Sequence, residues 1–452
     1  SNETELMLAG RSLPLWVALF TMTATWVGGG YLNGTAEFSF TAGALWGAQA
    51  GIGFALSLIL GGFFFARPMR RRNYVTLVDP LAQRYGGTIA AVLMIPAILA
   101  EVIWSAAILV AIGTTVSTLL GTDVRTAIVW AAAVAIGYTA TGGLRSVAYT
   151  DVVQLLLIVV GLGLALPFVV DVGGGLSNIL STAFPPMSSH REVISYFDLT
   201  IVLVLGGIPW NVYFQRVLAS KNERVAVQLS LAAGPLCALL AVPPLLMGLA
   251  ASHVDWTEIA GPDQAQGLLE NGSLVLPFLL KYTVPSWVSW LALGAISAAV
   301  MSSVDSSILS ASSLVAWNGY RRLFNPTASP EQTARLVRVL ILVLGLFAMT
   351  FALIVPSVKE LWYLCGDVVY CVLFPQLVLA LFDRKANGLG AITGFLTSSI
   401  LRLGGGIERM GVAPFLPYPD WMTESSFDFP FRSFAMAVGL VTSFFVSRWS
   451  GR

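Results

Sequence analysis

The sequence predicts an all-α integral membrane protein with about twelve transmembrane helices, two of which are interrupted in the middle. Of the 452 residues, 56% are hydrophobic and 11% are charged, whereas soluble domains carry roughly 25% charged residues. Glycine interrupts two of the apolar segments, at residues 28–30 and 206–207. A net charge of +1 without a basic stripe argues against nucleic acid as a partner. The lipid bilayer is the expected environment.

Apolar runs long enough to cross a hydrocarbon core of about 30 Å define the predicted spans. They are residues 13–35, 43–66, 88–120, 126–142, 146–170, 197–219, 225–251, 275–316, 335–355, 358–382, 388–404 and 432–449. The remaining residues are too few for a soluble domain.

Basic residues gather on one side of the predicted bundle. They follow the second, sixth, eighth and tenth spans: Arg70, Arg71, Arg72, Arg216, Lys221, Arg224, Arg321, Arg322, Arg384 and Lys385. By the positive-inside rule this side is cytoplasmic, and an even number of spans puts both termini of the chain there. We expect a multi-pass protein of the plasma (inner) membrane.

The spans divide into two blocks of five. Because five is odd, the second block has the opposite topology. Residues 1–170 are the expected first inverted repeat, 171–386 the second, and 387–452 two peripheral spans. The interrupted helices are then the first helix of each repeat, the arrangement that marks the binding site of an inverted-repeat secondary transporter.

Five acidic residues lie within or at the ends of apolar segments: Glu101, Asp151, Asp198, Asp305 and Asp367. Each would be costly facing lipid, so each is expected to face the bundle interior, a cation or a hydrogen-bond donor. An interhelical or helix-end hydrogen bond is the ordinary alternative. Asp198, at the predicted start of the sixth span, is expected to be an N-cap.

The eighth span is rich in small and polar residues. Helical spacing puts Ala299, Ser302, Ser303 and Ser306 on one face, with Asp305 at its border. Close helix packing is one explanation of this pattern.

A cation site is the other explanation. An unwound first helix frees the carbonyls of Ala24 and Val27. Together with the carbonyl of Ala299 and the hydroxyls of Ser302 and Ser303, these make five oxygens that suit a sodium ion.

Tryptophan lies at both interruptions. Trp26 and Trp210 flank the glycines, Trp104 follows Glu101 by one helical turn, and Trp362 lies in the tenth span. Most membrane-protein tryptophans sit at the interface, but Trp26 and Trp210 are predicted near the middle of the bilayer. Indole faces around a dry cavity bind quaternary ammonium groups through cation–π attraction. The site is expected to take an organic cation.

Several stretches carry specific motifs. They are TMTATWVGGGY at residues 21–31, SVAYTDVVQ at 146–154, GGIPW at 206–210, YFQRVL at 213–218 and the serine-rich stretch 298–307. In these, the chain resembles the sodium:solute symporter family, and within it the members that transport choline. The resemblance implies the leucine-transporter-type fold with a five-plus-five inverted repeat, coupling to sodium and, for choline-transporting members, dependence on chloride.

The resemblance also assigns candidate site residues. The family's sodium site falls on Ala24, Val27, Ala299, Ser302 and Ser303, with Asp151 near enough to bond the serines. The aromatic cage of the choline-transporting members falls on Trp26, Trp104, Trp210 and Trp362, with Tyr31 as a further candidate. Glu101, Asp305 and Ser306 are additional candidates.

Two departures from the family pattern are present. Phe54 stands where choline-transporting members tend to carry tyrosine, so a hydroxyl that could contact the choline hydroxyl is missing. The family usually has one more helix before its first broken helix, and we expect such a helix to precede the start of this chain.

The expected function is therefore sodium-coupled import of choline or a similar quaternary ammonium solute by alternating access. A sodium symporter for another small solute, such as betaine, carnitine or an amino acid, is the first alternative, and a membrane sensor that transports nothing is the second. A channel would need a continuous polar pore. No enzyme is expected, because the two histidines, His190 and His253, fall in outer loops and no nucleophile–base spacing is present.

Overall fold

The protein is helical wherever its structure is described. The computed structural model describes residues 3–141, 143–187, 189–355, 358–407, 412–416, 418 and 429–451. Within these ranges the β contacts are two isolated bridges, Leu13 with Ser220 and Ile407 with Val412. The predicted all-α class is confirmed.

The first half of the chain consists of α1 (Glu3–Leu8), η1 (Ala9–Arg11), α2 (Leu15–Trp26), α3 (Gly29–Ala42), α4 (Ala44–Leu60), η2 (Gly61–Ala66), α5 (Arg67–Arg71), α6 (Asp79–Tyr85), α7 (Gly87–Leu120), α8 (Val124–Thr141) and α9 (Leu144–Val172). The second half consists of α10 (Leu176–Ser181), α11 (His190–Gly206), α12 (Asn211–Ala219), α13 (Glu223–Ala251), α14 (Trp256–Ala260), α15 (Pro262–Glu270), η3 (Gly272–Leu274), α16 (Val275–Tyr282), α17 (Ser286–Leu314), η4 (Val315–Phe324), α18 (Pro330–Ile354), α19 (Val358–Val368), η5 (Val369–Leu373), α20 (Phe374–Phe382), α21 (Gly388–Gly404) and α22 (Phe431–Ser450).

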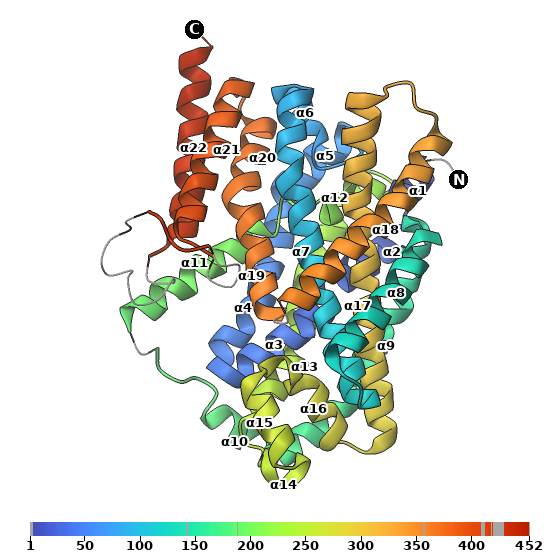
Figure 1. Ribbon diagram of the computed structural model, residues 1–452, viewed down its shortest axis with the longest axis vertical. Helices are drawn as coiled ribbons and strands as arrows, with labels where there is room; N and C mark the ends of the chain where they lie inside the picture. Colours follow the sequence, from blue (N-terminus) through green and yellow to red (C-terminus); the bar gives the residue numbers. More distant parts are fainter. Residues whose placement is uncertain are drawn as a thin grey trace.

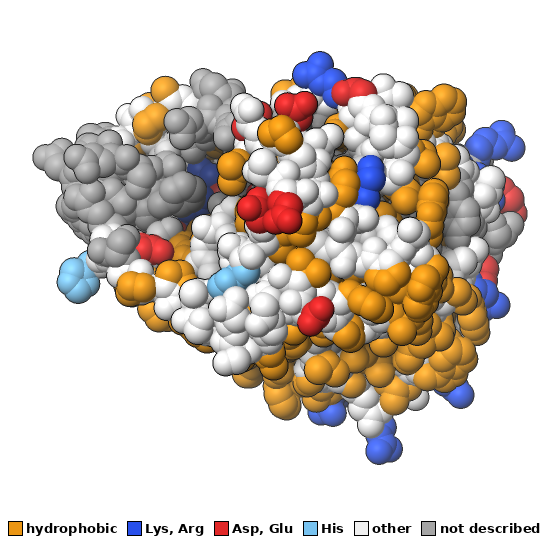
Figure 2. All heavy atoms as spheres, turned by 90° about the horizontal axis from the view of Figure 1, so that it is seen from below, with side chains coloured by type: hydrophobic (Ala, Val, Ile, Leu, Met, Phe, Trp, Pro, Cys, Tyr) orange, Lys and Arg blue, Asp and Glu red, His pale blue; other side chains and the backbone are white. Residues whose placement is uncertain are grey.

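The helices are long enough for a multi-span membrane protein. In the described ranges nine are long and apolar enough to cross a membrane, and the bent pair α2 and α3 makes a tenth span. The eleventh and twelfth predicted spans are helical as α21 and α22 but are not among these ten. The short helices α10, α14 and α15 lie at one end of the bundle, and both termini lie toward the other (Figure 1). Seen from the end that carries α10, α14 and α15, apolar side chains gather along the sides of the molecule (Figure 2).

The first predicted interruption lies between α2 and α3, which are bent by 48°. Helix α2 ends at Trp26, and α17 packs directly against the glycines that follow. A Cβ at Gly28 would lie 1.8 Å from Ser303 Oγ, and one at Gly29 would lie 1.9 Å from Val300 Cγ2. Only a residue without a Cβ allows this approach. The break therefore brings α2 against the serine-rich helix.

The second interruption lies between α11, which ends at Gly206, and α12, which begins at Asn211. Pro209 has no N–H with which to continue the helical ladder. Trp210 is extended, with φ −105° and ψ 131°, and is the N-cap of α12. A Cβ at Gly207 would lie 2.4 Å from a side-chain oxygen of α4. Both interrupted helices are thus confirmed.

Two predictions differ from the structure. The eighth span, predicted over residues 275–316, is two helices, α16 and α17, and Pro285 is the N-cap of α17. Helix α11 begins at His190, so the prediction that Asp198 is its N-cap is wrong. Asp198 Oδ1 instead accepts a hydrogen bond of 3.0 Å from the backbone N–H of Ser433, in the first turn of α22. Its carboxylate therefore caps a helix that is distant in the sequence.

A buried ion cluster joins α21 and α22 to the rest of the bundle. Arg402 of α21 and Arg432 of α22 each donate to Asp367 of α19 over 2.5 Å. Nη1 of Arg432 also lies 3.9 Å from Oδ2 of Asp198 in α11. All four side chains are buried. The peripheral helices are thereby tied to α11, which leads into the second interruption, and to α19, which carries Trp362.

Asp367→Asn is expected to lower the free energy of unfolding by about 3–5 kcal/mol, because two buried arginines lose the carboxylate that they share. Asp383→Asn is the matched control. It removes the partner of the more exposed Arg448, 2.8 Å away, and should cost less than about 1 kcal/mol. Thermal unfolding of the purified protein in detergent compares the two variants. Equal shifts would show that the buried cluster stabilises the bundle no more than a surface ion pair does.

Candidate functional site

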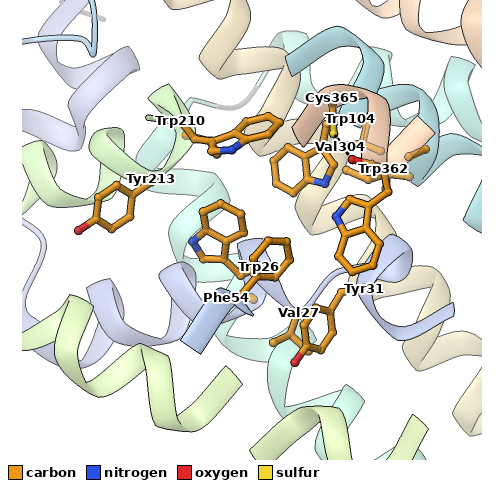
Figure 3. Packing of buried hydrophobic residues seen from close by; sticks show 14 of the residues in the cluster. Trp26, Val27, Tyr31, Phe54, Trp104, Trp210, Tyr213, Val304, Trp362 and Cys365 are labelled. Carbon is orange, nitrogen blue, oxygen red and sulfur yellow. Dashed lines mark hydrogen bonds between the residues drawn. The ribbon is translucent and has the colours of Figure 1, made fainter. Parts of the chain in front are cut away.

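The two interruptions bring tryptophans together in the middle of the bundle. The ring centroids of Trp26, the last residue of α2, and Trp210, the N-cap of α12, lie 6.4 Å apart. Trp104 of α7 lies 5.9 Å from Trp26 and 5.4 Å from Trp210. The three indoles are turned toward one another from three different helices (Figure 3). The breaks therefore place these three predicted residues in one cluster.

The other three aromatic candidates extend the same cluster. Phe54 of α4 lies 4.8 Å from Trp26 and 5.5 Å from Trp362 of α19. Tyr31 of α3 stacks on Phe54 at 6.0 Å. All six rings are buried, with exposed fractions of 3–6%. We call Trp26, Tyr31, Phe54, Trp104, Trp210 and Trp362 the aromatic cluster.

The polar atoms of these rings are not equally satisfied. The indole N–H of Trp210 donates to the carbonyl of Gly206 over 2.7 Å, and the Tyr31 hydroxyl donates to the carbonyl of Cys237 over 2.7 Å. The indole N–H of Trp26 is buried and has no hydrogen-bond partner among the described residues. A buried donor without a partner is uncommon and requires an explanation.

The aromatic cluster is closed in this conformation. Centroids 4.8–6.4 Å apart are contact distances for aromatic rings. One surface pocket of the described part lies away from these rings, beside Arg72, Gln83 and Arg84. A ligand between these rings therefore requires the rings to separate.

A second, polar group lies where α2 and α17 meet. Ser303 Oγ lies within hydrogen-bond distance of two carbonyl oxygens, 3.2 Å from that of Thr25 and 3.4 Å from that of Ala299. Ala24 and Val27 are completely buried beside them, at the C-terminal end of α2. The structure thus brings together the two segments that were predicted to hold sodium. Thr25, whose carbonyl contacts Ser303, was not predicted.

Asp151 of α9 completes this group. Its Oδ1 accepts from the hydroxyl of Ser302 over 2.5 Å, and its Oδ2 accepts from Thr21 over 2.5 Å. Asp151 thus accepts from one of the two predicted serines, Ser302, whereas Ser303 donates to backbone carbonyls. Because the two serine hydroxyls have acceptors for their protons, their lone pairs are available to a cation.

A buried arginine, missed in the sequence, lies beside Asp151. Arg216 of α12 is fully buried, with Nη2 3.8 Å from Oδ2 of Asp151. The same nitrogen donates to Ser306, one of the additional candidates. Arg216 is therefore a buried residue rather than an exposed loop charge, whereas Lys221 and Arg224, which follow it, are exposed. The signal available in the sequence was the position of Arg216 in the motif YFQRVL, six residues after the N-cap of a broken helix.

The other two acidic candidates differ in their partners. Both carboxylate oxygens of Asp305 are buried and have no hydrogen-bond partner in the described part of the chain, and Asp305 interacts electrostatically with Asp151 and Arg216. Glu101, in contrast, accepts hydrogen bonds from the Val212 backbone and from serines of α17. Asp305 therefore belongs with the polar group around Asp151. Glu101, a residue of α7, instead contacts α17 at Ser307 and Ser310.

Comparison with known proteins identifies the family of this chain. The model of the sodium:solute symporter family matches residues 6–398. The high-affinity choline transporter 1 of Drosophila melanogaster is 44% identical over 99% of this chain and 74% of its own length. The high affinity choline transporter 1 of Homo sapiens is 42% identical over 98% of this chain and 78% of its own length.

Solved structures show the same fold at low sequence identity. A Na⁺-coupled sialic acid symporter in a substrate-bound, outward-open state has a TM-score of 0.79 at 19% identity, covering 99% of this chain and 92% of its own. MhsT in complex with L-phenylalanine has a TM-score of 0.59 at 14% identity, covering 96% and 99%. The fold is the leucine-transporter type, as expected. With the family model matching most of its length, the chain belongs to the sodium:solute symporter family.

Proposed function

We propose that this protein is a sodium-coupled symporter that imports choline by alternating access. The observation that carries the proposal is the aromatic cluster, six buried rings from α2, α3, α4, α7, the start of α12 and α19, where the two broken helices meet. Ring faces hold a quaternary ammonium through cation–π attraction. The relatives that are more than 40% identical over nearly the whole chain are high-affinity choline transporters, which supports the same substrate.

The cluster also offers a hydrogen-bond donor suited to choline. The buried N–H of Trp26 has no partner within the described ranges, and the hydroxyl oxygen of choline is an acceptor that it could satisfy. Phe54 supplies a ring but no hydroxyl. We propose that Trp26 binds the solute at both ends, with its ring face toward the ammonium and its N–H toward the hydroxyl.

Sodium fits the polar group around Asp151. The proposed ligands are the carbonyls of Ala24, Val27 and Ala299 and the hydroxyls of Ser302 and Ser303. Asp151 holds Ser302 in place. The two unpartnered oxygens of Asp305 increase the need for a cation in this region. Coupled binding of sodium and solute would link uptake to the sodium gradient, which supplies the free energy.

The test is uptake of radiolabelled choline into proteoliposomes that contain the purified protein, with and without an inward sodium gradient. Sodium-dependent accumulation supports the proposal. Competition by betaine, carnitine and amino acids separates choline from the other small solutes, and binding without accumulation would instead indicate a sensor. Replacing chloride by gluconate tests the predicted chloride dependence.

The orientation and the repeats are part of the proposal. We infer that both termini of the chain are cytoplasmic, and that residues 1–170 and 171–386 are the inverted repeats, with 387–452 peripheral. The location of both termini toward one end of the bundle supports the inference (Figure 1). The orientation is measured by labelling the single-cysteine variants Lys221→Cys and Glu258→Cys from either side of sealed vesicles. Lys221 precedes α13 and Glu258 follows it.

The double variant Ser302→Ala with Ser303→Ala should raise the sodium concentration required for half-maximal uptake, because two proposed ligands are lost. Stability should fall by no more than about 1–3 kcal/mol, the cost of two lost hydrogen bonds. Ser312→Ala is the matched control: it is also buried in α17, but its hydroxyl donates to Ile308 of its own helix. An unchanged sodium requirement in the double variant would assign the serines to helix packing only.

A further inference from the structure

Glu101 is a fully buried carboxylate that the proposed cation sites do not use. Its Oε1 accepts from the backbone N–H of Val212 over 3.1 Å and from the hydroxyl of Ser310 over 2.8 Å. Its Oε2 accepts from the hydroxyl of Ser307 over 3.3 Å. None of the ion pairs found among the described residues includes Glu101. The hydrogen-bond donors to this carboxylate are therefore neutral, and the buried Arg216 interacts with it electrostatically without forming an ion pair.

The carboxylate lies between a helix start and the aromatic cluster. Val212 is the second residue of α12, whose N-cap is Trp210. Trp104 follows Glu101 by one turn of α7 and contacts Trp210, with centroids 5.4 Å apart. Glu101 thus contacts α12, which begins at Trp210, and it belongs to α7, which carries Trp104.

A helix start at this place is unfavourable for a cationic solute. The N-terminus of a helix carries roughly half a positive charge, and in transporters with broken helices such ends point at anionic groups of the substrate. An ammonium beside an uncovered α12 would be repelled. A carboxylate bonded to the first turn of α12 reverses the sign of the local charge.

We propose that Glu101 is a specificity-determining positioning residue, which fixes the start of α12 and makes the aromatic cluster select a cation over a neutral or anionic solute. The inference rests on the proposed function, since it concerns the charge of the solute at that site. If Glu101 has this role, its charge raises the affinity for a cationic solute but not for a neutral solute of the same shape. A hydrogen bond that only stabilises the fold would affect both solutes equally.

The test uses the full chain in detergent at saturating sodium, with two probes of equal shape. One is radiolabelled choline. The other is its neutral analogue 3,3-dimethylbutanol, in which carbon replaces the ammonium nitrogen, measured by competition. In Glu101→Gln the hydrogen bonds can largely persist while the charge is lost. The affinity for choline should fall roughly tenfold, the order expected for one charge lost at about 10 Å with an effective dielectric constant near 20. The affinity for the neutral analogue should stay within about twofold.

The controls separate the possible outcomes. Asp383→Asn also exchanges an acid for its amide, but at the end of α20, and should leave the affinity ratio of choline to the analogue unchanged. An equal loss for both probes in Glu101→Gln, or no loss for choline, would overturn the inference while the proposed function stands. Failure of the parent protein to bind choline would overturn both.

Glu101→Asp provides a second comparison if the glutamine variant does not fold. The charge is kept but drawn back from Val212 by one methylene group. The ratio of choline affinity to analogue affinity should then fall by a few-fold. An unchanged ratio in a folded Glu101→Asp protein would contradict the inference.

Discussion

Trp26→Ala or Trp210→Ala is expected to weaken choline binding about thirtyfold, because loss of a desolvated cation–π face removes about 2 kcal/mol. Both rings are buried, contact Trp104 and lie at the breaks. Phenylalanine should retain part of the binding at either position, since it keeps a ring face. The loss on Trp26→Phe should be the larger of the two, because the N–H of Trp26 has no protein partner whereas that of Trp210 is bonded to Gly206.

Isothermal titration calorimetry with choline on the purified variants measures these differences. Trp256→Ala is the matched control. Trp256 is also buried, but it lies in α14 and packs on Phe278 outside the aromatic cluster. Its loss should reduce stability without a comparable change in affinity. If both alanine variants at the breaks bind choline as tightly as the parent, the aromatic cluster is not the substrate site.

Asp151→Asn is expected to lower the apparent sodium affinity by roughly a hundredfold to a thousandfold, because a unit charge about 4 Å from an ion contributes several kcal/mol at an effective dielectric constant near 20. Asparagine keeps the shape, and its one oxygen can still accept from Ser302 while its NH2 group replaces the oxygen that accepts from Thr21, so choline affinity at saturating sodium should largely recover. Because coupling is reciprocal, sodium should enhance choline binding by a smaller factor in the variant. Choline binding across a sodium titration gives both quantities.

The structure adds a consequence for stability. Arg216 is fully buried 3.8 Å from Asp151, and losing this carboxylate should reduce the free energy of unfolding by about 3 kcal/mol. Asp171→Asn, at the exposed end of the same helix α9, is the control for both measurements. A variant at Asp151 that loses stability but keeps the parent's sodium enhancement would show that Asp151 serves only to neutralise Arg216.

Much of the candidate site could be predicted because its signals are local. Three consecutive glycines at residues 28–30 and the run GGIPW at 206–210 break a helix wherever they stand, since glycine permits unusual backbone and proline lacks an N–H. Trp26 and Trp210 are next to those breaks in the sequence, so their position in the middle of the bundle followed directly. The serine face of α17 follows in the same way from helical periodicity.

The hydrogen-bond and ion-pair partners of the buried polar side chains could not be predicted in the same way, because they depend on how the helices rotate and approach one another. Asp198 looked like the cap of its own helix, yet α11 starts at His190 and the carboxylate caps α22. Arg216 was predicted to be a charge on the cytoplasmic side, at the end of a span. In the structure α12 starts anew after the break at Trp210, and the Arg216 guanidinium is buried beside Asp151. A basic residue near a span end looks the same in the sequence whether it faces water or a buried acid.

The membrane-spanning class, the two broken helices and the residue types at the site are evident from the sequence, because composition, helical period and helix-breaking residues act within a few residues along the chain. Which carboxylate meets which donor is evident only from the folded structure. Glu101 lies 111 positions before the N–H that it accepts from, and Asp305 is left without a hydrogen bond one turn from a serine that has one. Such pairings depend on interhelical distances of a few ångströms, which no spacing within one segment specifies.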